Sequence, residues 1–298
     1  MPGPESSLLR DLYWFPYKEE PMDLFAAPSF LLPSESPDSL WHLFCSAIPG
    51  ACHHKSTSGL AWEKGDIIAR GGRTPSVSQD GNSYHMAYAR SSSVFLSSSV
   101  DLASWSKGLE TLKAEAVPYA SYRGGKPLLS YPQLVPWKGH YRLYFGAGES
   151  DYEGLPAYYG VAESAYLEGP YEVLKEPLLS PEPWGDPPVL AAGPLRIIPC
   201  QDALAALQAA VCYDEERDRT YSSLFLLFSQ DGLGWERGGI AVESRESGWS
   251  SGLITGADAH WKENERTWYC FYSAIKRYAS FPATKMGLLL GQKAKPLP

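Results

Sequence analysis

Several features that would assign a protein quickly to a class are missing from this sequence. The N-terminus has neither the basic nor the apolar segment of a signal peptide. No apolar run reaches the ~18 residues that a membrane-spanning helix needs. The five cysteines are an odd number and none are spaced as Cys-x-x-Cys, so reduced, mostly buried thiols are expected. Together these absences predict a cytoplasmic protein that does not enter a membrane.

Positive charge is scarce as well. The chain carries a formal net charge of −8 and has a pI near 5.3, and lysine and arginine form no run anywhere. Because binding to a nucleic-acid backbone requires a basic face, nucleic acid is not an expected partner. No long segment shows a helical period, so an α-helical fold is not expected either.

Aromatic residues, in contrast, make up 13% of the chain, and aromatic side chains pack well in strands. A Ser/Asp turn between two strands, followed by an aromatic residue, recurs along the sequence. The clearest copy is Phe95-Leu-Ser-Ser-Ser-Val-Asp-Leu-Ala-Ser-Trp105, and variants end at Trp62, Tyr171 and Trp235. A unit that returns with a turn and an aromatic residue indicates repeated β-blades.

Apolar patterning and turn residues predict five groups of strands, with about 60 residues for each group. The predicted strands are 25–32, 40–47, 53–59 and 62–69; 73–77, 84–89 and 95–99; 130–135, 141–145, 158–162 and 171–174; 193–198 and 221–228; and 253–261, 268–272 and 286–290. Residues 202–211 fit a short helix or an apolar strand. A further strand at residues 8–17 would complete the last group and close a ring. The predicted fold is an all-β, five-bladed β-propeller, with residues 1–298 as a single domain.

Three features resemble a known family. They are the Ser-x-Asp-Leu-x-x-Trp turn, the run from Gly160-Val-Ala-Glu-Ser to Gly-Pro-Tyr171, and inner strands that contain proline. Over nearly its whole length the chain is similar to the propeller glycosidases of glycoside hydrolase family 43, with families 32 and 68 as relatives. The resemblance implies three carboxylates around a central funnel. They are an Asp that acts as general base, an Asp that orients and tunes the pair, and a Glu that acts as general acid.

The positions that match these motifs hold no carboxylate. The base, tuning and acid positions fall on Ala27, Ser76 and Ser130. Two functions therefore stay open. One is a divergent glycosidase with relocated carboxylates, and the other is a pseudo-glycosidase that binds a sugar or glycan. An unrelated small-molecule reaction on the same scaffold is the alternative, since a fold does not fix a function.

The remaining candidate residues lie near the predicted inner strands. For catalysis they are Asp23, Asp186 and Asp258, each of which could instead be a solvated loop residue or a strand-end cap. Arg73 and Arg196 could fork onto the carboxylate of a uronic or sialic sugar, or could form structural ion pairs. Further candidates for ligand binding are Ser76, Tyr131, Gln133, Glu149, Gln201, Asp202 and His260.

No cofactor and no metal site are predicted from the residues themselves. A fifth-blade histidine supports a central ion in some members of the family, so the resemblance leaves a central calcium ion open, with His260 as the nearest histidine. The expected partner is a small-molecule or glycan ligand, and the sequence indicates no protein partner.

Overall fold

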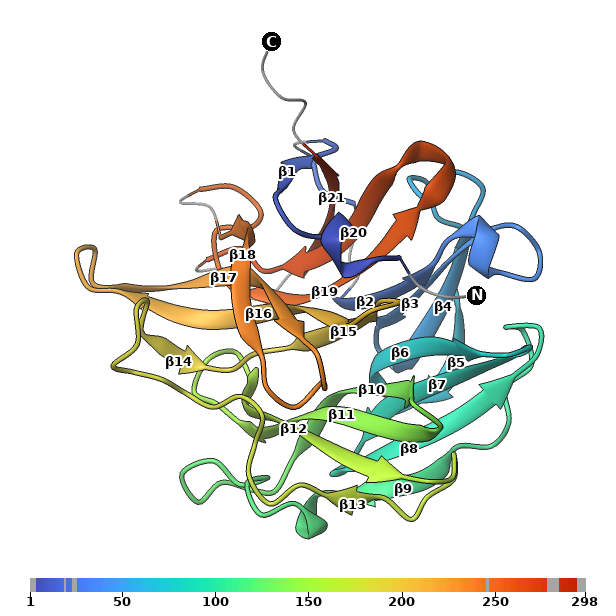
Figure 1. The fold of residues 1–298 in the computed structure, drawn as a ribbon, viewed down its shortest axis with the longest axis horizontal. Helices are drawn as coiled ribbons and strands as arrows, with labels where there is room; N and C mark the ends of the chain where they lie inside the picture. Colours follow the sequence, from blue (N-terminus) through green and yellow to red (C-terminus); the bar gives the residue numbers. More distant parts are fainter. Residues whose placement is uncertain (1–3, 19, 23–25, 245–246, 278–283, 294–298) are drawn as a thin grey trace.

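The computed structural model describes residues 4–18, 20–22, 26–244, 247–277 and 284–293. Five antiparallel sheets radiate from a common centre, which is the arrangement of a five-bladed β-propeller (Figure 1). The predicted all-β fold class is confirmed. In this part of the chain, no helix has the length and apolar character required to cross a membrane.

In each blade the strands follow one another from the centre of the propeller outward. The first is β2 (Ala26–Leu31), β3 (Trp41–Ser46), β4 (Gly50–Ser56) and β5 (Asp66–Arg70). The second is β6 (Arg73–Asp80), β7 (Ser83–Arg90), β8 (Ser93–Ser99) and β9 (Leu109–Lys113). The third is β10 (Leu129–Trp137), β11 (His140–Glu149), β12 (Pro156–Ser164) and β13 (Glu172–Val173).

In the fourth blade, β14 (Val189–Ala191) and β15 (Leu195–Pro199) both pair with β16 (Leu204–Asp214), followed by β17 (Arg219–Ser229) and β18 (Glu236–Glu243). The fifth is β19 (Ile254–Lys262), β20 (Thr267–Ala274), β21 (Lys285–Lys293) and β1 (Leu12–Pro16). The connections contain the 3₁₀ turns η1 (Ser6–Leu8), η2 (Pro33–Glu35), η3 (Ala114–Ala116) and η4 (Glu263–Glu265).

The fifth blade combines both ends of the chain. β1 pairs antiparallel with β21, with Leu12 opposite Lys293 and Pro16 opposite Leu289. The strand predicted at residues 8–17 therefore takes the outer position of the last sheet. At the centre, β2, β6, β10, β15 and β19 contact one another in this order, and β19 contacts β2. The inner strands thus form a closed ring around the channel.

The least regular part of the prediction was the fourth blade. Residues 202–211, for which a helix and a strand were both open, lie largely in strand β16. Nine consecutive residues from Leu204 to Cys212 are buried, because both faces of this sheet pack against neighbouring blades. A strand that is buried on both faces carries a continuous apolar run and loses the alternation that distinguishes strand from helix.

The recurring Ser/Asp turn has the same hydrogen bonds in two blades. Ser99 Oγ accepts from the Leu102 N–H at 2.9 Å, and Asp101 Oδ1 accepts from the next two N–H groups at 2.9 and 2.8 Å. The turn at Ser229 and Asp231 repeats this set, with distances of 2.8, 2.8 and 3.0 Å. Short polar side chains satisfy the backbone of the turn and so fix where the outer strand begins.

The aromatic residues that follow these turns pack between blades. The ring of Trp62 in the first blade lies 5.9 Å from that of Phe271 in the fifth, and Trp105 in the second lies 6.0 Å from Phe44 in the first. Phe271 also contacts Phe30 and Trp41. The repeat in the sequence is therefore a repeat of contacts between blades.

Phe271 should be the most sensitive residue of the contact between the first and last blades, because it is fully buried and its ring contacts the rings of three first-blade residues, Phe30, Trp41 and Trp62. Phe271→Ala should lower the free energy of unfolding by about 3–5 kcal/mol, measured by chemical denaturation. Ile48→Ala is the control, since Ile48 is 99% exposed, and its effect should stay within about 0.5 kcal/mol. A loss equal to the control would contradict this packing role.

Candidate functional site

Each blade contributes a bend to the neck of the central channel. One residue near the start of every inner segment has a positive φ, and the five are Ala27, Thr74, Tyr131, Gly193 and Gly256. A proline follows four of them. At Gly193 an added Cβ would lie 1.8 Å from the Ala209 carbonyl oxygen, so only glycine fits at this position.

The neck encloses a cavity of about 10 Å³, which is room for about one water molecule. Its described lining is apolar or uncharged except for Arg196, and contains no Asp or Glu. The lining residues are Ala27, Pro28, Thr74, Pro75, Tyr131, Pro194, Leu195, Arg196, Gly256 and Ala257.

The three positions where the family motifs place carboxylates lie at or beside this neck. Ala27 is buried and its N–H donates to Ser273 Oγ at 3.1 Å. Ser76 is buried on β6, and its Oγ has no hydrogen-bond partner among the described residues. Ser130 is half-buried on β10 beside the bend at Tyr131. The described residues of the neck therefore supply neither a general acid nor a general base.

Below the neck, four charged side chains from three blades form a continuous chain of ion pairs. Arg196 Nε lies 3.6 Å from Asp258 Oδ1, and Asp258 Oδ2 lies 3.6 Å from His260 Nε2. His260 Nδ1 donates to Glu35 at 2.8 Å. Asp258 also accepts from the Phe30 N–H at 2.9 Å, which ties the fifth blade to the first. We refer to these four residues as the channel ion chain.

The channel ion chain determines its own protonation. Burial opposes the charge of His260, but the carboxylates of Glu35 and Asp258 outweigh burial and raise the pKa of His260 to about 10. Burial also opposes the charge of Asp258, and Arg196 and His260 outweigh it, so the pKa of Asp258 lies below its ordinary value. At neutral pH the channel ion chain therefore contains two cations and two anions.

A central calcium ion at the channel ion chain would compete with the proton of His260, because a metal ligand must lose its proton. Arg196 also places a permanent positive charge beside Asp258. In the described ranges, no group of three or more His, Cys, Asp or Glu side chains is placed to hold a metal ion.

The structure thus brings together three of the predicted site residues, Arg196, Asp258 and His260, with Gln133 close by. Gln133 exchanges two hydrogen bonds with the backbone of Ile197, at 2.8 and 2.7 Å, and so joins the third blade to the fourth. Glu35 was not predicted. It lies in η2, 225 residues from His260, and no local pattern links the two.

The other predicted residues lie apart from this group. Asp202 accepts from the N–H and the hydroxyl of Ser6, at 2.8 and 2.7 Å, and the neighbouring Gln201 N–H donates to the Pro4 carbonyl, so both hold the N-terminal segment. Tyr131 lines the neck and its N–H donates to Thr74 Oγ1. Arg73, Glu149 and Asp186 are exposed. Asp23 lies outside the described residues.

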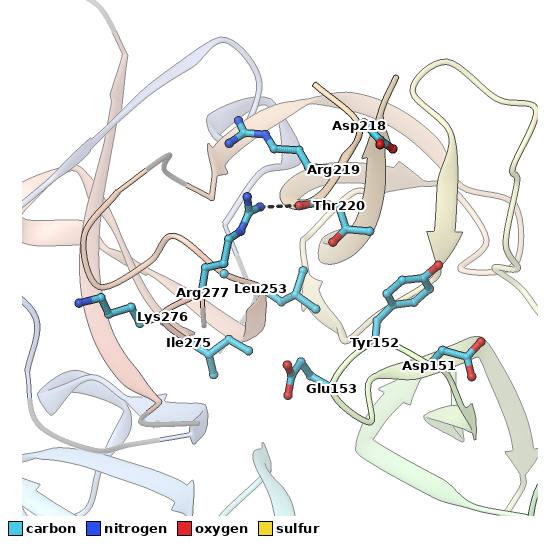
Figure 2. Close-up of a pocket in the computed structure, with 11 residues that line it drawn as sticks. Asp151, Tyr152, Glu153, Asp218, Arg219, Thr220, Leu253, Ile275, Lys276 and Arg277 are labelled. Carbon is cyan, nitrogen blue, oxygen red and sulfur yellow. Dashed lines mark hydrogen bonds between the residues drawn. The ribbon is translucent and has the colours of Figure 1, made fainter. Parts of the chain in front are cut away.

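The channel ion chain lines a chamber of about 270 Å³ at the C-terminal ends of the inner strands. A larger pocket, of about 480 Å³, lies toward the opposite end of the channel, because Gly252 and Leu253 of its lining directly precede β19 (Figure 2). We call this second space the mouth pocket. Its lining residues are Asp151, Tyr152, Glu153, Asp218, Arg219, Thr220, Gly252, Leu253, Ile275, Lys276 and Arg277.

Four segments from three blades build the mouth pocket, one of them being Gly252 and Leu253 before β19. The loop between β11 and β12 supplies Tyr152, the hairpin between β16 and β17 supplies Arg219, and the segment after β20 supplies Arg277. Arg219 and Arg277 enter from one side of the pocket, and Tyr152 and Glu153 from the other (Figure 2). None of these residues was predicted. The pair Lys276-Arg277 directly after an apolar strand was the one signal in the sequence.

Comparisons with known proteins agree with the fold. No protein-family model matches the chain, and no curated protein matches it. Among solved structures, GH43B of the xyloglucan PUL of Bacteroides ovatus aligns with a TM-score of 0.59 and 11% identity, over 93% of this chain and 54% of that one. A mutant α-L-arabinanase from Cellvibrio cellulosa aligns with a TM-score of 0.60 and 11% identity, over 90% and 92%.

The family 32 β-fructofuranosidase of Bombyx mori aligns with a TM-score of 0.59 and 12% identity, over 91% of this chain and 62% of that one. The chain thus spans about half the length of the first of these enzymes. Its fold is that of the five-bladed propeller glycoside hydrolases, and identities of this size show the fold alone.

The channel ion chain should make the free energy of unfolding fall as the pH rises into the alkaline range. Because the pKa of His260 is raised from 6.5 to about 10 by folding, its contribution is complete below pH 6.5 and is lost as the pH rises through 10. Chemical denaturation between these two pH values should show a smaller loss of stability for His260→Gln than for the unmodified protein. Equal slopes for the two proteins would contradict a protonated His260.

Proposed function

We propose that this chain binds a carbohydrate at the mouth pocket and does not hydrolyse it. The observation that carries the proposal is the set of residues at the three motif positions, Ala27, Ser76 and Ser130, within an otherwise complete five-bladed fold. Hydrolysis of a glycosidic bond uses two carboxyl groups about 5–10 Å apart, one protonated and one ionised. The described lining of the neck, beside which the family motifs place these groups, offers none, and Asp151, Glu153 and Asp218 of the mouth pocket stand at none of the motif positions.

Relocated carboxylates are the competing explanation, and Asp258 is the strongest described candidate. A general acid needs a raised pKa, so that it holds a proton at the working pH. The pKa of Asp258 is lowered, and its oxygens already face Arg196, His260 and the Phe30 N–H. Asp258 therefore acts in the framework of the channel in this proposal, and not in catalysis.

The mouth pocket has the size and lining of a ligand site. Its volume of about 480 Å³ lies within the range of about 300–1,000 Å³ that is usual for small-molecule sites. Leu253 and Ile275 form an apolar part of its lining, and the half-buried ring of Tyr152 stands beside them (Figure 2). A tyrosine offers an apolar face for a sugar ring and a hydroxyl for its polar edge.

Binding without hydrolysis can be tested directly. A panel of mono- and oligosaccharides, neutral and acidic, should include at least one that raises the unfolding temperature. A ligand at about 100 times its Kd stabilises the folded state by about 2.7 kcal/mol. Prolonged incubation with that sugar should release no reducing ends. Release that disappears in Asp258→Asn would instead support the divergent glycosidase.

Two tyrosine variants locate the site. Tyr152→Ala should lose most of the ligand-induced rise in unfolding temperature, because it removes the ring from the pocket lining. Tyr166→Ala is the control, since Tyr166 is 70% exposed on the loop after β12 and lines a different surface. Each rise is measured from that variant's own unfolding temperature without ligand. An undiminished rise in Tyr152→Ala would place the ligand elsewhere.

A further inference from the structure

The geometry of the mouth pocket points to a ligand class: we infer that it takes an acidic sugar, whose carboxylate is held by Arg277 and Lys276 while its ring lies toward Tyr152. This inference rests on the proposed binding function and names the ligand of that same site. It depends on three observations: where the cations of the pocket lie, which of its carboxylates are engaged by other groups, and how Arg277 is anchored.

The cations of the pocket come from neighbouring segments. Lys276 and Arg277 follow β20 in succession, and Arg219 at the start of β17 adds a third positive charge to the lining. Lys276 is exposed. These three cations share the lining with three carboxylates, Asp151, Glu153 and Asp218, so the charge that a ligand meets depends on how the carboxylates are engaged.

Two of the three carboxylates of the pocket lining are engaged by other groups. Asp151 Oδ2 accepts from Arg123 Nη1 at 2.7 Å, and Arg123 does not line the pocket. Asp218 Oδ1 accepts a hydrogen bond from the Tyr213 hydroxyl, which also lies outside the lining. Glu153 is the third carboxylate of the lining. The Arg123 guanidinium therefore offsets the charge of one of the three carboxylates, and the cations of the lining have less negative charge to balance within the pocket.

Arg277 is anchored at two points. Its backbone N–H donates to Ser251 Oγ at 3.2 Å, and its Nη2 donates to the Thr220 carbonyl oxygen at 2.6 Å (Figure 2). A guanidinium has five N–H donors in a planar fork, so donors remain for a ligand after the Thr220 bond. Anchoring reduces the side-chain entropy that binding would otherwise cost, and the fork matches a carboxylate in two parallel hydrogen bonds.

The experiment compares sugars that differ only in charge. Trigalacturonic acid, its fully methyl-esterified form and neutral galactotriose are titrated by calorimetry, with D-glucuronic acid and D-glucose as a second pair and sodium acetate as a carboxylate without a sugar. We expect at least one acid to bind at least about tenfold more tightly than its uncharged counterpart and than acetate. Added salt should weaken its binding, since the attraction is electrostatic.

Charge-removing variants test the assigned residues. Arg277→Gln should weaken binding of the acid about tenfold, and Lys276→Gln, at an exposed position that folding does not depend on, about threefold. Neither should change the affinity for a neutral sugar. Lys107→Gln is the control with the same change in charge, because Lys107 is exposed and lies outside the pocket. It should leave the affinity for the acid unchanged.

The outcomes separate this inference from the function on which it rests. Equal affinity for an acid and its neutral counterpart, equal affinity for acetate, or no effect of Lys276→Gln and Arg277→Gln would overturn the acidic ligand and leave carbohydrate binding standing. Binding of no sugar, charged or neutral, would overturn both. Preference for the acid that is lost in the two pocket variants and kept in Lys107→Gln would support both.

Discussion

Asp258 is the point at which the blades are held together across the channel. Its carboxylate accepts from the Phe30 N–H in the first blade, faces Arg196 from the fourth and faces His260 of its own strand. A buried carboxylate without such partners would be strongly unfavourable, so each partner is required by the others. One side chain therefore links three inner strands at the centre of the ring.

The same interaction explains why the centre of the propeller is not a site of acid–base chemistry in our proposal. A catalytic pair needs two carboxyl groups whose surroundings separate their pKa values, with one raised above its ordinary range. The channel ion chain does the reverse for Asp258, whose charge is stabilised by Arg196 and His260. An ionised Asp258 that stabilises the fold needs cations beside it, whereas a catalytic acid needs surroundings that raise its pKa.

Much of the fold could be predicted from the sequence because its determinants are local. The turn at Ser99 and Asp101 is built from side chains that bond their own backbone, and such turns separate strands wherever they occur. The blade count follows from these signals, and the outer place of the 8–17 strand follows from the strand that the last group lacks. The fourth blade was harder, because β16 is buried on both faces and shows no alternation.

The channel ion chain was predictable from the sequence only where its residues lie on inner strands. Arg196, Asp258 and His260 were chosen for that reason, and they do meet. What they form is a mutually neutral group, and this depends on Glu35, which comes from a 3₁₀ turn with no sequence relation to β19. Gln133 shows the same limit. Its amide was expected to meet a ligand, and both ends of the amide are bonded to the backbone of Ile197.

The mouth pocket escaped prediction for a different physical reason. Its residues lie on loops, and a loop side chain acquires a function from the loops of other blades that fold beside it. Arg277 is oriented by the Thr220 carbonyl of another blade, 57 residues earlier in the chain. The propeller thus separates two tasks along one axis. Charges that neutralise one another lie between the inner strands below the neck, while exposed loop residues at the mouth, such as Lys276, are available to a ligand. Such a division lets the recognition surface change its ligand without disturbing the interaction that holds the blades in register.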